Sequence, residues 1–562
     1  FIPLPPVMVE FLSPKAFSIH KANQVITGSA SWMTLSVHPK ATLSEFFRYA
    51  SYVMFYALTV QLLTNRKTLQ LTVFTIVGFG GLLAFSSILQ FYLTQDMALW
   101  FRHTPNNAIV MGPYVNHNHY AGLMEMIFPI VLGLFLFYRP KIGSTNLIKG
   151  IAEIFNQEKA NIHILIGTCA LLIIVSIFVS LSRGAMISTC LALVVFAILL
   201  LQRKISKGNA IVLIGVIMVS AASVGWFGWE EIFERFARLK NAQGVIYEHR
   251  LDFWKDTAGI IADFPVAGSG MGTFSDIYPL YRSFSGRLFL THAHNDYLEL
   301  FSNTGVIGFS LAALFMASLI FKSHQIFIRR RDAFSIYLYM GCLTALTAIL
   351  IHSMTDFNLH IGANGLWFFF ICGLLVSAAH TGHSPRDIPS RLLPVTSLFT
   401  KRIFMIMVLA AGMLTFFYNA SDLLGRFYYA NIRQVVLQAR MPAEQLNAIQ
   451  KVADLAADVD PFQAEYPFMG ANTRWFQKKP DQAETLYATA LGLDPLDSRR
   501  LNRMARFLAR GQMNDRAHLA FTKSMQYDRS NAAYRFEYAA WLFTRQKKEQ
   551  GLAAMKKAIA LD

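Results

Sequence analysis

Residues 171–201 read LLIIVSIFVSLSRGAMISTCLALVVFAILLL and contain a single charged side chain, that of Arg183. A helix of about 20 apolar residues is long enough to cross the hydrocarbon core of a bilayer. The stretch therefore predicts the end of one membrane span, a short turn at Arg183 and the whole of a second span. This pattern decides the fold class, because it predicts a membrane protein built from helices.

The same pattern recurs along most of the chain. Of its 562 residues, 54% are hydrophobic and only 15% are charged, whereas soluble globular proteins carry about 25% charged residues. The four cysteines, at positions 169, 190, 342 and 372, all lie in apolar windows, which predicts buried thiols without disulfides or metal. Windows of suitable length predict about ten spans, near 46–65, 69–93, 119–138, 162–181, 185–201, 209–228, 297–321, 334–353, 364–380 and 403–418.

The basic residues predict how the chain is oriented. Lysine and arginine gather in alternate loops, which the positive-inside rule assigns to the cytoplasm. The chain is therefore predicted to be a multi-pass membrane protein, with loops 94–118 and 230–296 facing outward. The net charge of +17 is then a topology signal, and no nucleic-acid partner is expected. The predicted cytoplasmic set is Arg66, Lys67, Arg139, Lys141, Lys149, Lys159, Arg203, Lys204, Lys207, Lys322, Arg329, Arg330, Arg331, Arg386, Arg391, Lys401 and Arg402.

Three segments are predicted from hydropathy: an outward-facing 1–45, a transmembrane domain 46–418 and a periplasmic 419–562. We expect further spans upstream of Phe1, since it is not a natural start. The tail has a period of 34 residues, with aspartates at 460, 494, 528 and 562 and small residues at 483, 517 and 551. This period resembles tetratricopeptide repeats and predicts an α-solenoid that binds a partner or a substrate. The D-x-D pair at 458 and 460 is expected to cap a helix.

Polar side chains concentrate at the predicted outer ends of the spans. Because they share one membrane depth, we expect one convergent site. Arginine forks bind phosphate, and histidine suits a general base, so the set fits displacement of a phosphate leaving group from a lipid diphosphate. Glycines 268, 270 and 272 are expected to form turns, not a dinucleotide site. The candidate residues are Asn116, Asn118, Arg183, Arg250, Arg282, His292, His294, Asn295, Tyr297, Glu299, His352 and Asp356.

Several of these segments together resemble the bacterial O-antigen ligase and O-antigen polymerase superfamily. The most specific part is His294-Asn295, followed after nine residues by Gly305-x-x-Gly308. Other segments also resemble motifs of the family. They are HRLDFW with Arg250, the P-x-x-G-x-G-x-G-x-F run 265–274, Tyr-Arg at 281–282, SRG at 182–184 and the N-x-N at 116–118. The resemblance covers roughly 40–380, and the repeat tail is an appendage.

The resemblance implies an all-helical membrane fold of the GT-C type and a glycosyltransferase without metal or cofactor. It also implies that the protein lies in the bacterial inner membrane, with the active site and the repeat tail facing the periplasm. His294 would deprotonate or orient the acceptor hydroxyl. Arg183, Arg250 and Arg282 would hold the departing undecaprenyl diphosphate, and the anomeric carbon would be inverted. The remaining candidates would support these groups.

The acceptor stays open at this point. The implied reaction is transfer to a glycan or to the lipid A–core of lipopolysaccharide. An O-antigen or exopolysaccharide polymerase, whose acceptor is a second lipid-linked glycan, and a protein O-oligosaccharyltransferase would use the same donor chemistry. A transporter or flippase with a scaffold tail is disfavoured, because transporters bury ionisable groups near the midplane. Here nearly all such groups lie at span ends, with Glu125 the nearest exception.

Overall fold

The computed structural model describes residues 2–28, 33–93, 97–98, 102–104, 110–140, 160–203, 215, 249–284, 290–381, 398–435, 437 and 441–561. The regular secondary structure of these ranges is helical apart from two short antiparallel strand pairs, β1 (Pro3–Leu4) with β2 (Met33–Thr34) and β3 (Met97–Ala98) with β4 (Arg102–His103). The helices of the first 380 residues are α1 (Pro6–Leu12), α2 (Pro14–Thr27), α3 (Pro39–Leu62), α4 (Arg66–Leu93), α5 (His117–Phe137), α7 (Ala160–Val179), α8 (Arg183–Gln202), α11 (His249–Asp263), α12 (Phe274–Tyr281), α13 (Asp296–Ile328), α14 (Ala333–His352), the 3-10 turn η1 (Asn358–His360) and α15 (Gly362–His380). The remaining helices are α16 (Leu398–Ala430), α17 (Ala443–Val459), α18 (Glu465–Phe476), α19 (Pro480–Leu493), α20 (Ser498–Arg510), α21 (Asn514–Tyr527), α22 (Ala532–Thr544) and α23 (Lys548–Ile559).

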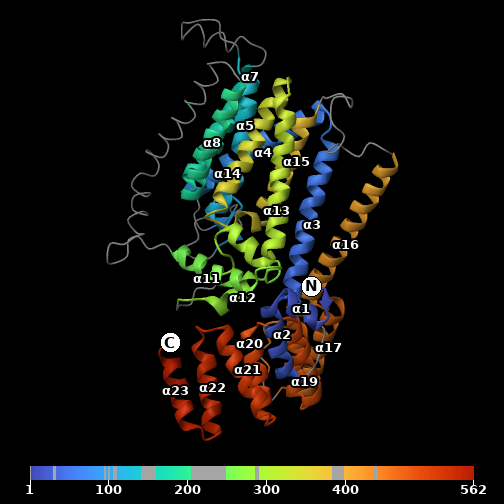
Figure 1. Ribbon diagram of the computed structural model, residues 1–562, viewed down its shortest axis with the longest axis vertical. Coiled ribbons are helices and arrows are strands. Elements are labelled where there is room, and N and C mark those ends of the chain that lie inside the picture. Colours follow the sequence, from blue (N-terminus) through green and yellow to red (C-terminus); the bar gives the residue numbers. More distant parts are fainter. Residues whose placement is uncertain are drawn as a thin grey trace.

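The upper part of the molecule in Figure 1 is a helical bundle. Eight helices of the described chain are long and apolar enough to cross a membrane: α4, α5, α7, α8, α13, α14, α15 and the 402–430 part of α16. The prediction of an all-α, polytopic membrane protein is thereby confirmed. Helix α5 forms the centre, because 89% of its apolar window is buried and it packs against α4, α7, α8 and α14. A Cβ at Gly341 would lie 2.7 Å from the Pro129 carbonyl oxygen, so this glycine permits the close contact of α14 with α5.

Three details of the predicted spans and thiols need comment. The predicted span 46–65 lies in α3 but is not among the eight helices, because the tyrosines and polar residues of α3 lower its hydropathy. The predicted span 209–228 falls outside the described residues, with the exception of position 215. Cys169, Cys342 and Cys372 are buried as predicted, but the prediction is wrong for Cys190, which is exposed on the outer surface of the bundle.

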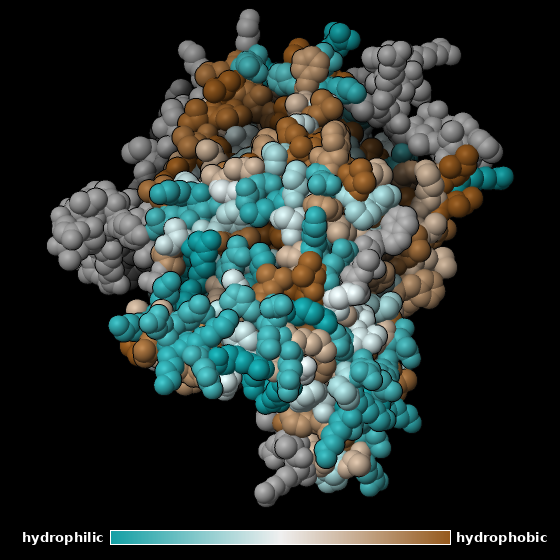
Figure 2. Space-filling model, turned by 60° about the horizontal axis from the view of Figure 1, so that its bottom comes forward, coloured by the Kyte–Doolittle hydropathy of each residue, from teal (hydrophilic) through white to brown (hydrophobic). Residues whose placement is uncertain are grey.

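The lower part in Figure 1 joins segments that are far apart in the sequence. Residues of the N-terminal segment, of α11 and α12 and of the tail share one hydrophobic core, which includes Ile19, Phe264 and Phe507. Polar contacts add to it, since Asn23 Nδ2 donates to the Pro495 carbonyl at 2.8 Å. The surface of this end is mostly hydrophilic, as Figure 2 shows. The N-terminal segment therefore packs between the loop helices and the tail.

The tail repeats the same geometry every 34 residues. Asp460, Asp494 and Asp528 directly follow α17, α19 and α21, and their φ/ψ angles are −130°/82°, −143°/86° and −134°/88°. Ala483 and Ala517 are fully buried in α19 and α21, at the small-residue positions of the period. The periodicity is thus seen in the helices, while their assignment to tetratricopeptide repeats stays a prediction.

Asp460 is the C-cap residue of α17, where its amide donates to the Ala456 carbonyl at 3.0 Å, but its side chain does not take part in the cap. Its carboxylate oxygens accept from Lys40 Nζ at 2.9 and 2.8 Å, so the residue ties the tail to the start of α3.

Candidate functional site

A cavity of about 190 Å³ lies at the end of the bundle that faces the loop helices. Helices α5, α8 and α11 all begin at this cavity. Because the N-terminus of a helix carries a partial positive charge, their convergence suits an anionic ligand. Two guanidinium groups on the cavity wall add full charges to this. The lining residues are His117, Asn118, Leu181, Arg183, Gly184, Arg250, His352, Thr355 and Asp356.

Helix caps place these N-termini at one depth. Asn116 Oδ1 accepts from the Asn118 amide at 2.9 Å and starts α5. Ser182 Oγ accepts from the Ala185 amide at 3.4 Å and starts α8, so that Arg183 is the first residue of that helix. Asn116 of the N-x-N motif and Ser182 of the SRG motif are therefore helix caps. The side chains of Asn118 and Arg183, in the same motifs, line the cavity.

The histidine motif is held in the same manner. Asn295 Oδ1 accepts from the amides of Tyr297 and Leu298 at 3.0 and 3.1 Å and caps α13. Asn295 Nδ2 donates to the Met354 carbonyl at 2.9 Å, and Tyr297 Oη donates to the Leu350 carbonyl at 2.7 Å. Asn295 and Tyr297 thus fasten the His294 loop to the end of α14, and neither lines the cavity.

His294 lies beside the cavity, next to Asp356. Its Nδ1 is 3.5 Å from Asp356 Oδ1, and its ring meets the Phe357 ring edge to face at 4.8 Å. Burial would raise the pKa of Asp356, but His294 and the charges of His352 and His119 hold it well below its usual range. Asp356 is therefore charged and lies beside Nδ1 of the His294 imidazole, at a separation longer than an ordinary hydrogen bond.

The backbone is strained on both sides of this site. Leu181 and His294 have φ angles of 57° and 51°, a left-handed conformation that non-glycine residues rarely adopt. Such strain persists only where the surroundings enforce it, and it is commonly found at functional sites. Leu181 directly precedes the cap of α8, and His294 directly precedes the cap of α13.

Beneath the cavity, His352 is fixed by a buried carboxylate. His352 Nδ1 lies 2.8 Å from Glu125 Oε1, and Ser188 Oγ donates to the other oxygen of Glu125. Gly184 makes room for this ring, because a Cβ at position 184 would lie 2.7 Å from His352 Nε2. Sequence analysis noted Glu125 only as an exception to the pattern. A carboxylate in the middle of an apolar span was the available signal, since such groups are kept in membranes for a function or a partner.

A second network lies on the other side of Phe357. His292 Nδ1 is 2.9 Å and His360 Nε2 is 3.3 Å from Glu299 Oε1, and His360 Nδ1 is 2.7 Å from Asp296 Oδ1. Burial alone would lower the pKa of His360, but Glu299 and Asp296 outweigh it and raise the pKa to about 9. A protonated His360 between two carboxylates balances their charge. His292 and Glu299 were predicted as supporting residues, whereas His360 and Asp296 were recognised only as polar groups at this depth, without a role of their own.

The same network contains a set of possible metal ligands. One atom each of His292, Glu299 and His360 lie within 4.8 Å of one another. Two imidazoles and a carboxylate are a ligand set that divalent transition metals use. Removal of metal from the protein therefore distinguishes a metal site from a network held by hydrogen bonds alone. That the protein uses no metal stays a prediction.

The glycine run 265–274 packs against the segment around Gly305. Gly305 interrupts α13 with φ 62° and ψ −168°. The backbone on either side pairs with the glycine run, since the Val306 amide donates to Pro265 O at 2.8 Å and the Gly270 amide donates to Asn303 O at 3.0 Å. Gly268, Gly270 and Gly272 have positive φ, which confirms that the run forms turns.

The interruption at Gly305 also corrects the predicted span 297–321. Asp296–Thr304 is a separate helical segment that carries the polar network, and its Asp296 and Glu299 are buried among protein groups. The segment 306–328 has 23 residues and at 1.5 Å per residue reaches about 34 Å, enough to cross the membrane without it.

Arg282 is the one predicted arginine that the structure does not bring to the cavity wall. It ends α12, and its Cζ lies 4.5 Å from the centre of the Phe284 ring. Phe284 contacts Phe253, whose ring centre is 6.2 Å from that of His294. The rings of Phe284 and Phe253 thus form an aromatic layer, with Arg282 against the first ring and His294 beside the second.

Fold and site together define a multi-pass helical membrane protein with a basic, histidine-bearing cavity at one end of its bundle. Residues 168–313 match the O-antigen ligase family, and this stretch contains Arg183, Arg250, Arg282 and His294. Over this region the chain is similar to the O-antigen ligase family, which supports glycan transfer of that general kind. No curated protein matches the chain.

Proposed function

We propose that the chain transfers a glycan from undecaprenyl diphosphate to an acceptor hydroxyl at the periplasmic face of the bacterial inner membrane. One observation carries the proposal: Arg183 and Arg250 line a single cavity with Asp356, and Asp356 Oδ1 lies 3.5 Å from His294 Nδ1. The cavity combines the cations that a diphosphate leaving group needs with a base for the attacking hydroxyl.

In this proposal the arginines and the helix N-termini bind the donor. Arg183 and Arg250 contact the diphosphate oxygens and stabilise the charge that develops as the C1–O bond breaks. Bidentate guanidinium contacts also fix the direction of the leaving group. Arg282, behind the aromatic layer, would contact the donor only if the lipid diphosphate extends past Phe284.

His294 acts on the acceptor. Because Asp356 approaches Nδ1, Nε2 is the ring atom that takes the proton of the acceptor hydroxyl. The acceptor oxygen forms a bond to the anomeric carbon while the bond to the diphosphate breaks on the opposite side, which inverts that carbon. The electron pair leaves with undecaprenyl diphosphate, and the proton stays on His294 until it returns to solvent. No metal takes part in this mechanism.

Purified protein with a lipid-linked oligosaccharide and three acceptors tests the proposal. Lipid A–core, a second lipid-linked glycan and a serine-containing peptide are offered separately, and the extended product is identified by mass. Extension of lipid A–core supports a ligase, whereas extension of only the second glycan or the peptide reassigns the chain to a polymerase or a protein glycosyltransferase. Uptake of the oligosaccharide into vesicles without any product would refute transfer altogether.

The repeat tail is proposed to recruit another envelope protein, in keeping with its 34-residue period. Deletion of residues 440–562 should then reduce glycan output in cells while the membrane domain still accumulates. Unchanged output in the truncated strain would count against recruitment.

A further inference from the structure

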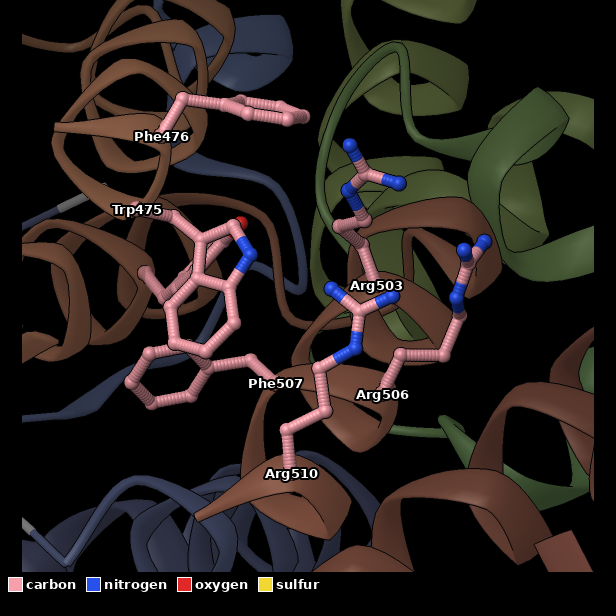
Figure 3. A pocket seen from close by; sticks show the side chains of 7 residues that line it. Trp475, Phe476, Arg503, Arg506, Phe507 and Arg510 are labelled. Carbon is pink, nitrogen blue, oxygen red and sulfur yellow. The ribbon is translucent and has the colours of Figure 1, made fainter. Parts of the chain in front are cut away.

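A second cavity lies in the tail, in a part of the chain that the proposed reaction does not use. It has a volume of about 190 Å³ and is formed by residues of α18, α19 and α20 (Figure 3). It lies at the hydrophilic end of the molecule, where α21 of the tail also contacts α12 of the loop helices. Its lining residues are Trp475, Phe476, Tyr487, Arg503, Arg506, Phe507 and Arg510.

One wall of this cavity is aromatic. The rings of Trp475 and Phe507 meet edge to face with their centres 5.1 Å apart, and Tyr487 follows at 5.3 Å from Phe507. Tyr487 is buried, and its hydroxyl donates to Asn472 Oδ1 at 2.8 Å. These contacts hold the ring faces in place, so that the wall is formed before any ligand arrives.

The opposite wall is cationic. Arg503, Arg506 and Arg510 are spaced i, i+3 and i+7 along α20 and therefore share one face of that helix. In Figure 3 their guanidinium groups lie across from the rings of Trp475 and Phe476.

Two of these arginines are held in place by neighbours inside the cavity. Arg503 Nε donates to Asn472 Oδ1 at 2.9 Å, and Arg510 Cζ lies 5.7 Å from the centre of the Trp475 ring. Both guanidinium groups are therefore positioned against the aromatic wall.

The cationic wall is short of negative charge. Arg506 Nη1 pairs with Glu537 at 3.1 Å, but none of the described residues that line the cavity is acidic. Three like charges on one helix face repel one another, and an anion bound in the cavity would offset this repulsion. Guanidinium forks bind carboxylate and phosphate groups with two parallel hydrogen bonds.

We propose that this cavity binds an anionic sugar residue of the glycan chain that the membrane site transfers. The apolar face of the pyranose ring packs against the aromatic wall, while its carboxylate or phosphate substituent faces Arg503 and Arg510. The volume favours a single residue, because cavities for drug-sized ligands measure about 300–1,000 Å³. The inference rests on the proposed function, which supplies a glycan at this end of the molecule and at high local concentration.

Binding of free tetrasaccharides to the full chain in nanodiscs tests this inference by calorimetry. The probes are tetragalacturonate, a phosphorylated maltotetraose, neutral maltotetraose and tetraglutamate. We expect at least one charged tetrasaccharide to bind about tenfold more tightly than neutral maltotetraose, as one charge-assisted contact requires. Whichever of the two binds identifies the substituent as carboxylate or phosphate.

Variants assign the binding to the cavity. Arg510→Gln and Arg503→Gln should each weaken binding of the charged tetrasaccharide by about tenfold. Arg510→Lys keeps the charge but loses the guanidinium fork, so its affinity for the charged tetrasaccharide should lie between those of the wild type and Arg510→Gln. Arg433→Gln is the matched control, because Arg433 is exposed in the tail outside the cavity, and it should bind like the wild type.

Three results would overturn the inference: equal binding of neutral maltotetraose, unchanged binding in both glutamine variants, or tighter binding of tetraglutamate, which would indicate a peptide partner. The free tetrasaccharides need no lipid-linked donor. Binding without transfer activity would therefore refute only the proposed function, and transfer activity without binding would refute only this inference.

Discussion

The interruption of α13 at Gly305 makes a specific prediction about the substitution Gly305→Ala. At φ 62° and ψ −168° the backbone is in a region that is essentially restricted to glycine, and a side chain there costs about 1–3 kcal/mol. The added Cβ would also lie closer than van der Waals contact to Val266 O and 2.7 Å from the Ala267 amide nitrogen. These are backbone atoms of the docked glycine run, which cannot rotate away as a side chain would.

The two effects together predict a loss of about 3 kcal/mol or more in the free energy of unfolding. At about 2–4 °C per kcal/mol for a domain of 150–250 residues, Tm should fall by about 6–12 °C. Transfer activity should fall as well, because the glycine run and the His294 segment lose their common support.

Thermal unfolding in detergent, followed by tryptophan fluorescence, measures the effect. Gly78→Ala is the matched control, since Gly78 lies in helix α4 with no atom within 4 Å of an added Cβ. That variant should be as stable as the wild type or more stable by about 0.5–1 kcal/mol. A Tm of Gly305→Ala equal to that of Gly78→Ala would refute the account of the glycine motif.

Three further predictions concern the site. Arg183→Lys should lower the rate of glycan transfer by about 10–100-fold, because a lysine replaces the charge but not the bidentate contacts; a rate within twofold of the wild type in the lipid-linked donor assay would contradict this. Because the pKa of His360 is raised from 6.5 to about 9, its stabilising contribution is complete below pH 6.5 and is lost as the pH rises through 9. The Tm difference between wild type and His360→Gln should shrink over that interval, and a constant difference would show that His360 is not charged. Incubation with EDTA should leave transfer unchanged; loss that a divalent ion restores would make His292, Glu299 and His360 a metal site.

Sequence patterns predicted the membrane class well, because the length and apolarity of a span follow directly from the thickness of the bilayer. They were less accurate where a helix contains a break. The span 297–321 looked continuous, since a glycine inside an apolar run does not reveal by itself that the helix is interrupted. The break at Gly305 depends on the docked run 265–274, a tertiary contact that local periodicity does not encode.

The site was predicted in outline. Asn118, Arg183, Arg250, His352 and Asp356 meet at one cavity because the helix ends that carry them lie at one depth. The partners of these residues were harder to foresee. Glu125 and His352 are separated by 227 residues, and their pairing follows from the packing of α5 against α14. Arg282 was predicted as a site residue because it is an arginine like Arg183 and Arg250. It does not line the cavity, because its position at the end of α12 directs it toward Phe284.

The rate of glycan transfer from undecaprenyl diphosphate by His294→Ala tests the central claim most directly. Wild type, His294→Ala and the matched control His518→Ala, in an exposed part of α21, are reconstituted with the same lipid-linked donor and acceptor. We expect the rate of His294→Ala to fall by about 10²–10⁴-fold, as loss of a general base does, with donor binding retained and His518→Ala unchanged. A wild-type rate in His294→Ala would contradict the account.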